Sequence, residues 1–315
     1  MSTTDPTIRV LSLGAGRQST ALAILAARGE LEPLDAAVFS DTGWEPPAVY
    51  AHLERLRVEV LEPAGIPLHI VSNGSIRRDA LDPAHRFASM PLHVRRVDGT
   101  PTIARRQCTN EYKLVPILRR IRTLLGAPDR DDGVPGRVPR GRWAEQWIGF
   151  SVDERSRALD ARHTLYAVPR YPLLERGLSV DDCLAVCAAA GFGQVAKSAC
   201  IGCPYSTNST WRRMRDHDPE SWADAVAFDH ELRTRPLPDG ATVYLHKSLE
   251  PLDVAPLGTT SAEWRAAQGD LVSLLSAEAV AAALDDDDLE VVGCGPHTCR
   301  VPGDPDDDDL PDDEL

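Results

Sequence analysis

The stretch that decides the fold is Ile8-Arg9-Val10-Leu11-Ser12-Leu13-Gly14-Ala15-Gly16-Arg17-Gln18-Ser19-Thr20, where a mostly apolar segment runs into a glycine-rich turn. The Ala- and Leu-rich segment that follows predicts a helix over residues 19–28. Gly14 and Gly16 let a phosphate approach the backbone closely, while the amides at the helix start and the Ser19 hydroxyl supply donors to an anion. The stretch therefore predicts a strand, a turn and a helix arranged to bind a nucleotide phosphate.

A second apolar strand follows and ends on an acid in Ala37-Val38-Phe39-Ser40-Asp41-Thr42-Gly43-Trp44-Glu45. A Walker loop needs a Gly-Lys-Ser/Thr sequence, and this turn contains no lysine. A dinucleotide-binding loop needs a third Gly or Ala where this chain has Ser19, although the spacing to Asp41 suits a ribose contact. The dinucleotide loop stays open as an alternative.

The run Phe39–Gly43, followed by Glu45-Pro46 and Tyr50, resembles the Asp-Thr-Gly segment of phosphoadenylyl-sulfate (PAPS) reductases and their relatives, the PP-loop ATP pyrophosphatases. That family carries Ser-Gly-Gly-x-Asp-Ser where this chain has Gly14 to Ser19. Gly16 and Ser19 match, whereas Gly14 replaces the first Ser, Ala15 a Gly and Gln18 the Asp. Losing that acid argues against metal-assisted ATP cleavage.

Four later blocks resemble bacterial and phage proteins described only as PAPS reductase-like, some of which carry a Cys-x-x-Cys-Pro motif. They are Arg106–Lys113, Trp147–Arg155, Ala199–Tyr205 and Leu245–Ser248. The resemblance implies an α/β fold: a doubly wound parallel sheet of the Rossmann type, like that of the adenine nucleotide alpha hydrolases. A helical, cysteine-bearing C-terminal region should follow it.

The apolar pattern agrees with this fold. It predicts strands at residues 8–13, 36–40, 68–71 and 146–150, and helices at 19–28, 47–61, 113–125, 180–190, 211–216 and 219–233. Strands that alternate with helices imply a parallel sheet covered on both faces, with the ligand at the carboxyl ends of the strands. We expect a nucleotide-binding domain at 1–170, a helical cysteine-bearing region at 171–303 and a disordered acidic tail at 304–315.

The net charge of −14 comes mostly from the C-terminal segment. Residues 285–315 hold 13 acids and one arginine, which leaves 35 acids against 33 Lys and Arg in the rest of the chain. No apolar run approaches twenty residues and no signal peptide is visible, so we expect a cytoplasmic protein without membrane contact. The pattern leaves the oligomeric state open.

The stretch from Arg95 to Arg142 is basic, with 12 Lys and Arg against 5 acids. It would suit the phosphates of ATP, of a sulfonucleotide or of a nucleic-acid substrate. We favour phosphate binding for Arg105 and Arg106, and we weigh it equally with a solvated helix face for Arg119, Arg120 and Arg122. Residues 126–142, rich in Pro, Gly, Asp and Arg, predict a long flexible loop that suits a lid or a nucleic-acid finger.

Seven cysteines give the second signal. Cys183 and Cys187, four apart on a predicted helix, suit core packing. Cys200-Ile201-Gly202-Cys203-Pro204 suits metal ligation, because the spacing lets both thiolates face one ion. A 4Fe-4S cluster needs four thiolates. Our preferred ligands are Cys108, Cys200 and Cys203 with one of Cys294 and Cys299, of which we favour Cys299. Zinc on the same thiols, or no metal, are the alternatives.

The resemblance assigns roles around the loop. The expected nucleotide-binding residues are Ser12, Gly14, Gly16, Arg17, Gln18, Ser19, Asp41, Thr42, Gly43 and Gly149. Asp153 or Glu154 would hold Mg²⁺ or the phosphate network, although acids are also favoured at a helix start. Arg157 would stabilise the leaving pyrophosphate. The preferred function is adenylation of a substrate oxygen by ATP and its replacement by sulfur from a donor through the cluster, with a nucleic-acid base among the candidate substrates.

Two alternatives stay open. Gly293-Cys294-Gly295-Pro296-His297 resembles the Glu-Cys-Gly-x-His segment with which PAPS reductases attack the sulfur of PAPS or adenylyl sulfate (APS), with Gly293 in place of the Glu. Cys294 would then be the nucleophile, and a thioredoxin-like protein the reductant. Alternatively, the chain is a non-catalytic subunit that binds a nucleotide and a cluster without cleaving the nucleotide, for which Gln18 is the best support.

Overall fold

The computed structural model describes residues 5–82, 84–85, 90–131, 133–158, 164–193, 195, 198–234 and 240–258. These residues form two compact units. The first unit contains the described residues up to Ser75 and those from Cys108 to Ser198, and the second contains those from Ile76 to Gln107 and from Ala199 onward. The described residues of 171–198, which we expected in the helical cysteine-bearing region, therefore belong to the first unit.

A five-stranded sheet forms the centre of the first unit. Its strands are β1 (Ile8–Leu13), β2 (Ala36–Asp41), β3 (Leu68–Ser72), β6 (Ala144–Trp147) and β7 (Ala167–Arg170), in the order β3-β2-β1-β6-β7. Each of these neighbouring pairs is parallel. The prediction of an α/β fold with a parallel, Rossmann-like sheet is confirmed at this level. The strand order reverses between β1 and β6, and such a switch point is where open α/β sheets bind ligands.

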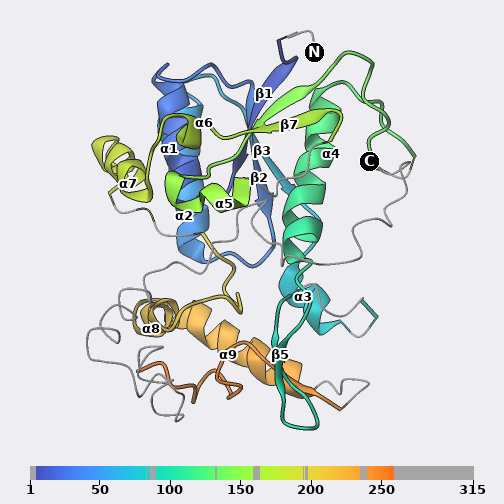
Figure 1. Ribbon diagram of the computed structural model, residues 1–315, viewed down its shortest axis with the longest axis vertical. Coiled ribbons are helices and arrows are strands. Elements are labelled where there is room, and N and C mark those ends of the chain that lie inside the picture. Colours follow the sequence, from blue (N-terminus) through green and yellow to red (C-terminus); the bar gives the residue numbers. More distant parts are fainter. Residues whose placement is uncertain are drawn as a thin grey trace. The chain divides into compact units, whose positions relative to one another are not determined.

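Helices cover both faces of this sheet, as Figure 1 shows for α1 and α4. On one face, Leu11 and Leu13 pack with α1 (Arg17–Ala27), α2 (Pro47–Leu56), α6 (Pro172–Glu175) and α7 (Val180–Ala189). On the other, Val10 and Val38 pack with α4 (Val115–Leu124). Successive strand residues point to opposite faces, so the mostly apolar strand β1 supplies both cores.

Short helical turns complete the first unit. Two π-helical turns, η1 (Arg57–Leu61) and η2 (Asn110–Leu114), follow α2 and precede α4. A 3₁₀ turn, η3 (Val152–Glu154), leads into α5 (Arg155–Ala158). The turns η2 and η3 matter for the site, because they carry side chains to the carboxyl edge of the sheet.

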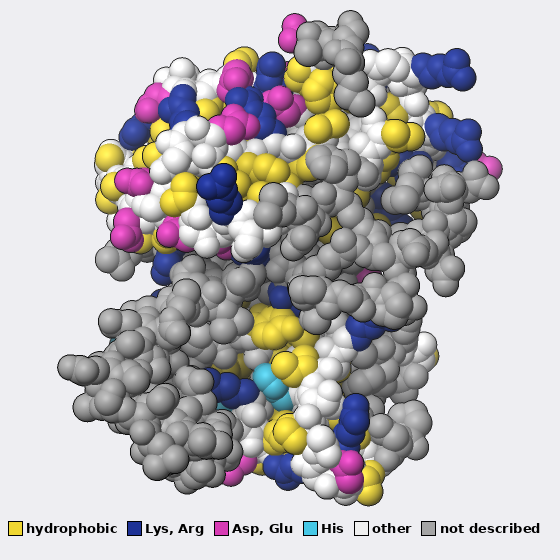
Figure 2. All heavy atoms as spheres, viewed as in Figure 1, with side chains coloured by type: hydrophobic (Ala, Val, Ile, Leu, Met, Phe, Trp, Pro, Cys, Tyr) yellow, Lys and Arg dark blue, Asp and Glu magenta, His cyan; other side chains and the backbone are white. Residues whose placement is uncertain are grey.

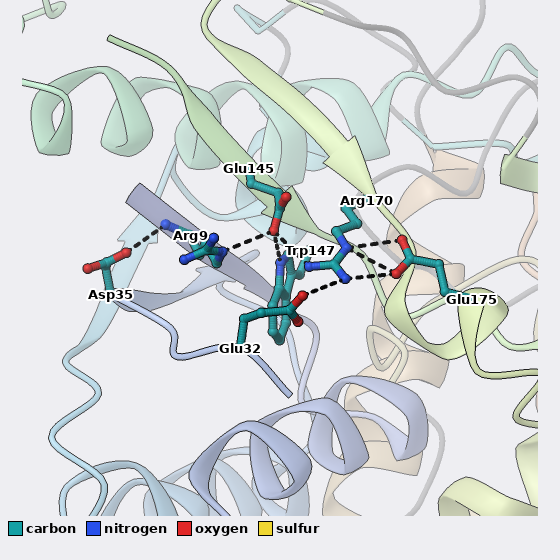
Figure 3. A network of polar contacts seen from close by, with 7 residues as sticks. All are labelled: Arg9, Glu32, Asp35, Glu145, Trp147, Arg170 and Glu175. Carbon is teal, nitrogen blue, oxygen red and sulfur yellow. Dashed lines mark hydrogen bonds and ion pairs between the residues drawn. The ribbon is translucent and has the colours of Figure 1, made fainter. Parts of the chain in front are cut away.

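A polar network ties β7 to its neighbours (Figure 3). The guanidinium of Arg170 bonds the carboxylates of Glu175 (2.9 Å), Glu32 (3.0 Å) and Glu145 (3.1 Å). Glu145 also accepts the indole N–H of Trp147 at 2.7 Å. Among the described strands, β7 has β6 as its one neighbour. These side-chain bonds therefore add to the backbone pairing that holds β7 in the sheet.

The loop of residues 126–142 contains no helix or strand among its described residues, and it is tied to α4. The guanidinium of Arg122 donates to the carbonyl of Gly136 at 2.6 Å, and Arg142 donates to the carbonyl of Leu125 at 2.9 Å. Arg122 thus has a structural partner. The use of this loop as a lid or finger stays a prediction.

The second unit contains α3 (Ile76–Leu81), α8 (Asn208–His217) and α9 (Pro219–Thr234). It also holds a small antiparallel sheet in the order β5-β4-β8, formed by β4 (His93–Arg95), β5 (Pro101–Ile103) and β8 (Thr242–Tyr244). We did not expect this sheet from the sequence. Among the described helices, none is long and apolar enough to cross a membrane.

Candidate functional site

The turn after β1 closes around one side-chain oxygen. The Ser19 hydroxyl oxygen accepts the amide N–H of Gly14 at 3.2 Å and that of Gly16 at 3.3 Å, and the hydroxyl donates to the Gly16 carbonyl at 3.3 Å. Helix α1 starts directly after Gly16. Two loop amides thus converge on the Ser19 hydroxyl at the positive end of a helix. The expected contact of this turn with a phosphate stays a prediction.

Two backbone positions in this loop are sterically demanding. Ala15 is buried and has φ of 53°, a left-handed conformation that glycine adopts more readily. A Cβ atom on Gly149 would lie 3.1 Å from the amide nitrogen of Ser19, so the segment after β6 passes directly against the start of α1. Gly149 therefore allows two loops to meet at the switch point.

The end of β2 forms a second tight turn. The carboxylate of Asp41 accepts the amide of Gly43 and the hydroxyl of Tyr50, both at 2.8 Å. Burial, and then the hydrogen bond to Asp41, raise the pKa of Tyr50 above its ordinary value, so this hydroxyl stays a donor. Asp41 is held at the carboxyl end of β2, and its expected ribose contact stays a prediction.

Gly43 directs the chain into the interior. It has φ of 69°, and a Cβ atom there would lie 2.9 Å from the Cα of Ser75. The Thr42 hydroxyl, which is buried, then donates to the carboxylate of Glu45 at 3.0 Å. The turn thus places the Glu45 carboxylate in a buried position next to the loop that follows β1.

A small pocket lies at this edge of the sheet, with a volume of about 240 Å³ that includes space open to solvent. Its lining consists of Leu13, Gly14, Phe39, Ser40, Glu45, Lys113, Ile117 and Ser198. The Lys113 ammonium lies 3.9 Å from a carboxylate oxygen of Glu45, and the two residues are only 7% and 3% exposed. The pocket therefore combines apolar walls with a buried ion pair and a loop backbone.

The π-helical turn η2 positions Lys113. The Ser40 hydroxyl donates to the carbonyl of Tyr112 at 2.6 Å, and the Asn73 side-chain amide donates to the carbonyl of Glu111 at 3.0 Å. A side chain near the end of β2 and one directly after β3 thus hold the turn through its backbone oxygens. Glu45 and Lys113 were not among the predicted site residues, although both lie in the quoted motifs and Lys113 belongs to the basic stretch. The signal that could have identified them is a charged residue next to a largely apolar segment, since Glu45 follows β2 and Lys113 precedes α4.

The segment after β6 brings Glu154 beside the loop. The Gln18 side-chain amide donates to Glu154 at 3.1 Å, and Arg157 forms an ion pair with the same carboxylate. The Asp153 carboxylate instead accepts the amide of Val180 at 2.8 Å, at the start of α7. These contacts give Asp153 a structural partner and leave Glu154 and Arg157 nearer the loop, and all three catalytic roles stay predictions.

Two other predicted residues have internal partners. Ser12 is buried in β1 and accepts a hydrogen bond from the side-chain amide of Gln146 at 2.8 Å. The Arg17 guanidinium donates to the carbonyl of Val195 at 3.2 Å. Both residues shape the sheet edge around the turn, and their expected nucleotide contacts stay predictions.

The cysteines divide between the two units. Cys200 and Cys203 share a turn in the second unit, where the amide of Cys203 donates to the carbonyl of Cys200 at 3.2 Å, and both side chains are buried. Cys108 is half-buried in the first unit, while Cys294 and Cys299 lie outside the described residues, as does the acidic tail. No group of three or more His, Cys, Asp or Glu arranged for a metal ion occurs within the described ranges. Two adjacent thiols do not satisfy a cluster, so the metal stays a prediction.

Cys183 and Cys187 lie in the core between α1 and α7. Burial raises the pKa of Cys183 to about 12 and that of Cys187 to about 11. The Cys187 thiol donates to the carbonyl of Arg17, with a sulfur-to-oxygen distance of 3.7 Å. Both are protonated packing residues at neutral pH, since a thiolate would have to form in an apolar environment.

No family model, no curated protein and no solved structure matches this chain. The inferences that follow therefore depend on the geometry of the site and on the sequence blocks themselves.

Proposed function

We propose that this chain binds an adenine nucleotide at the carboxyl edge of the first unit's sheet and uses it to activate a substrate oxygen as an adenylate. The observation that carries the proposal is the convergence of the Gly14 and Gly16 amides on a single oxygen at the topological switch point. The PP-loop ATP pyrophosphatases, of the adenine nucleotide alpha hydrolase-like class, are the family whose chemistry fits this arrangement.

The charges near the loop suit a triphosphate. The start of α1 contributes positive potential, and the buried Lys113 adds a cation to the same pocket. In the proposed step, the substrate oxygen attacks the α-phosphorus of ATP. The bond from that phosphorus to the bridging oxygen breaks, and pyrophosphate leaves with the bonding electrons. Mg²⁺ would enter with the nucleotide, since Glu154 is already bonded to Gln18 and Arg157.

The second step replaces the adenylated oxygen with sulfur. A donor at the oxidation level of sulfide attacks the carbon that bears the adenylate, and AMP leaves with the oxygen. The Cys200–Cys203 turn is our candidate for receiving the donor, because one hydrogen-bonded turn carries both cysteines. A 4Fe-4S cluster or a zinc ion on Cys108, Cys200, Cys203 and Cys299 stays part of the proposal, and no step is routed through it.

One contact favours a second candidate, a subunit that binds the nucleotide without cleaving it. Gln18 stands where the family has an acid, and its amide donates to Glu154. An amide oxygen is neutral, so Gln18 cannot supply the negative charge that a carboxylate ligand gives to Mg²⁺. Reduction of PAPS or APS through Cys294, with a thioredoxin-like reductant, depends on a residue outside the described ranges.

The test uses the full chain purified without oxygen. Titration calorimetry with ATP, PAPS and APS measures binding, and a coupled assay measures pyrophosphate release in the presence of DNA or RNA. We expect ATP binding that weakens on the order of tenfold in Lys113→Met, about 1.4 kcal/mol, and that is unchanged in the exposed control Arg28→Ala. Binding without pyrophosphate release would favour the non-catalytic subunit, and no binding of any nucleotide would refute both.

The metal prediction is tested on the same preparation. Iron, acid-labile sulfide and zinc are measured in the wild type and in Cys200→Ala and Cys203→Ala. About four irons and four sulfides per chain, lost in both variants, would support a cluster. Zinc alone, or no metal, would remove the cluster from the proposal.

A further inference from the structure

Arginine side chains of the second unit stack on tyrosine rings. In β4, His93 and Arg95 point to the same face of the sheet, because side chains alternate along a strand. Tyr244 of β8 pairs with His93, and the Arg95 guanidinium lies 5.0 Å from the centre of the Tyr244 ring. Arg95 also donates to the carbonyl of Leu249. A ring and a neutral carbonyl thus hold this cation in place.

The face of the sheet that carries His93 and Arg95 also contacts the chain directly after the Cys200–Cys203 turn. The ring nitrogen Nε2 of His93 donates to the carbonyl of Pro204 at 3.2 Å, one residue after Cys203. The Arg106 guanidinium lies 4.5 Å from the centre of the Tyr205 ring. Burial, and then the charge of Lys247, lower the pKa of His246. Burial is also the main cause of the lowered pKa of His93, and Lys247 is a smaller one. His93 thus joins the face of β4 and β8 to the residue after Cys203, and Arg106 stacks on the ring two residues after Cys203.

The hairpin that carries Arg95 is poor in acids. Residues 90–107 contain four arginines and one acid, Asp98. The Asp98 carboxylate accepts the amide of Thr100 at 2.9 Å, which lowers the pKa of Asp98 and uses the charge within the turn. Arg96 and Lys247 are exposed, and Val97 at the hairpin tip is 78% exposed. On the face drawn in Figure 2, Lys and Arg side chains lie beside a histidine in this unit.

We infer that this surface, defined by Arg95, Arg96, Arg106 and Lys247, binds the phosphodiester backbone of a polynucleotide and brings a base to the Cys200–Cys203 turn. Arginine planes held on aromatic rings are suited both to phosphates and to unstacked bases. The inference rests on the proposed function, because it names the substrate class that would receive sulfur. An acidic protein partner is the outcome that the test must separate from it.

The test is fluorescence anisotropy with labelled single-stranded DNA, single-stranded RNA and duplex DNA of about 20 nucleotides, over a series of salt concentrations. The variant Arg95→Ala/Lys247→Ala removes two cations. The control Arg28→Ala/Arg176→Ala removes two exposed cations from the first unit. We expect the first variant to bind a single strand on the order of tenfold more weakly and to lower the salt slope by about 1.4, at 0.7 per phosphate contact. The control should match the wild type.

Arg96→Ala, in the exposed turn, gives a second measure if Arg95→Ala disturbs the fold. ATP binding by the same proteins separates the two proposals. If ATP binds and no polynucleotide binds at about 50 mM salt, or if neither basic-surface variant weakens binding, the inference is wrong and the proposed function survives. If the polynucleotide binds in the expected way and ATP does not bind, the surface stands and the proposed function fails.

Discussion

The ammonium of Lys113 lies 3.9 Å from a carboxylate oxygen of Glu45, and both residues are buried at the carboxyl edge of the parallel sheet. A buried ion pair is weak support for stability, because removing two charges from water offsets their attraction. The pair is therefore better explained by its position in the pocket beside Gly14. A ligand phosphate there would draw the ammonium from Glu45.

Lys113→Met should lower the free energy of unfolding by roughly 3–5 kcal/mol, because the Glu45 carboxylate would be left buried without its cation. Denaturant titration measures this change. Lys113→Met/Glu45→Leu should recover most of the lost stability and none of the ATP affinity. Normal ATP affinity in the double variant would show that the pair is structural only.

Ala15→Gly should stabilise the protein. Ala15 has φ of 53°, and a left-handed residue with a Cβ atom costs about 1–2 kcal/mol. Glycine removes this cost, but it also raises the entropy of the unfolded chain, which destabilises the folded state by up to about 1 kcal/mol. The expected net gain is about 0.5–1 kcal/mol, read from the urea midpoint.

The matched control is Ala21→Gly, inside helix α1, where the same replacement should cost about 1 kcal/mol. Equal losses in the two variants would contradict the assigned backbone strain at Ala15. A gain only at residue 15 would support it.

The sequence predicted the first sheet well and the second poorly, for physical reasons. β1 and β2 are mostly apolar segments bounded by turn residues, so their bounds follow closely from the pattern. We expected a strand at residues 146–150, whereas β6 covers Ala144–Trp147. The expected range was too far along the chain because Ile148 and Phe150 are apolar, and these two residues are buried in the loop after β6. β7 is a four-residue edge strand that contains Pro169 and was missed.

The second unit and the pocket escaped prediction because they depend on contacts between distant segments. β4, β5 and β8 have three residues each, too few for an alternating pattern to be recognised. The turn between β1 and α1 was predicted, because its glycines and Ser19 are close in sequence, whereas the bonds of the Gly14 and Gly16 amides to Ser19 were not. The pairing of Glu45 with Lys113 was not, since only the fold joins segments that follow β2 and precede α4.

The pH dependence of stability should contain a term from His246. Its Nε2–H donates to Asn208 at 2.9 Å, its Nδ1 accepts the amide of Ser248 at 3.2 Å, and burial lowers its pKa to about 4. The folded protein then binds fewer protons than the unfolded chain between pH 6.5 and 4. Stability should fall by up to about 3 kcal/mol as the pH drops through that window.

Thermal unfolding of the wild type and of His246→Asn at several pH values checks this term. The variant should be less stable at pH 7.5, because the buried partners Asn208 and Ser248 lose a matched group. The difference between the two proteins should shrink toward pH 4.5. A constant difference would contradict the assigned neutral state of His246.

The contribution of the Arg170 network to stability should also depend on pH, and the change should occur at acidic pH. Hydrogen bonding to Arg170 lowers the pKa of Glu32, so this carboxylate adds stability above its ordinary pKa, and the contribution is lost as the pH falls. Arg170→Gln removes the positive charge that pairs with Glu32, Glu145 and Glu175. Because two of these partners are about half-exposed, we expect a loss of only about 1–2 kcal/mol at pH 7.

The loss should narrow as the carboxylates become protonated below about pH 4, which denaturant unfolding at pH 7 and pH 3.5 would show. Arg28→Gln is the matched control, since Arg28 contacts Glu30 at 4.0 Å on an exposed surface, and its effect should be small at both pH values. An Arg170→Gln effect independent of pH would mean that the guanidinium acts by packing over the Trp147 ring, 5.6 Å away, and not by its charge. Because Arg170 is the last residue of β7, a loss that follows carboxylate protonation would show that charge holds this edge strand in the sheet.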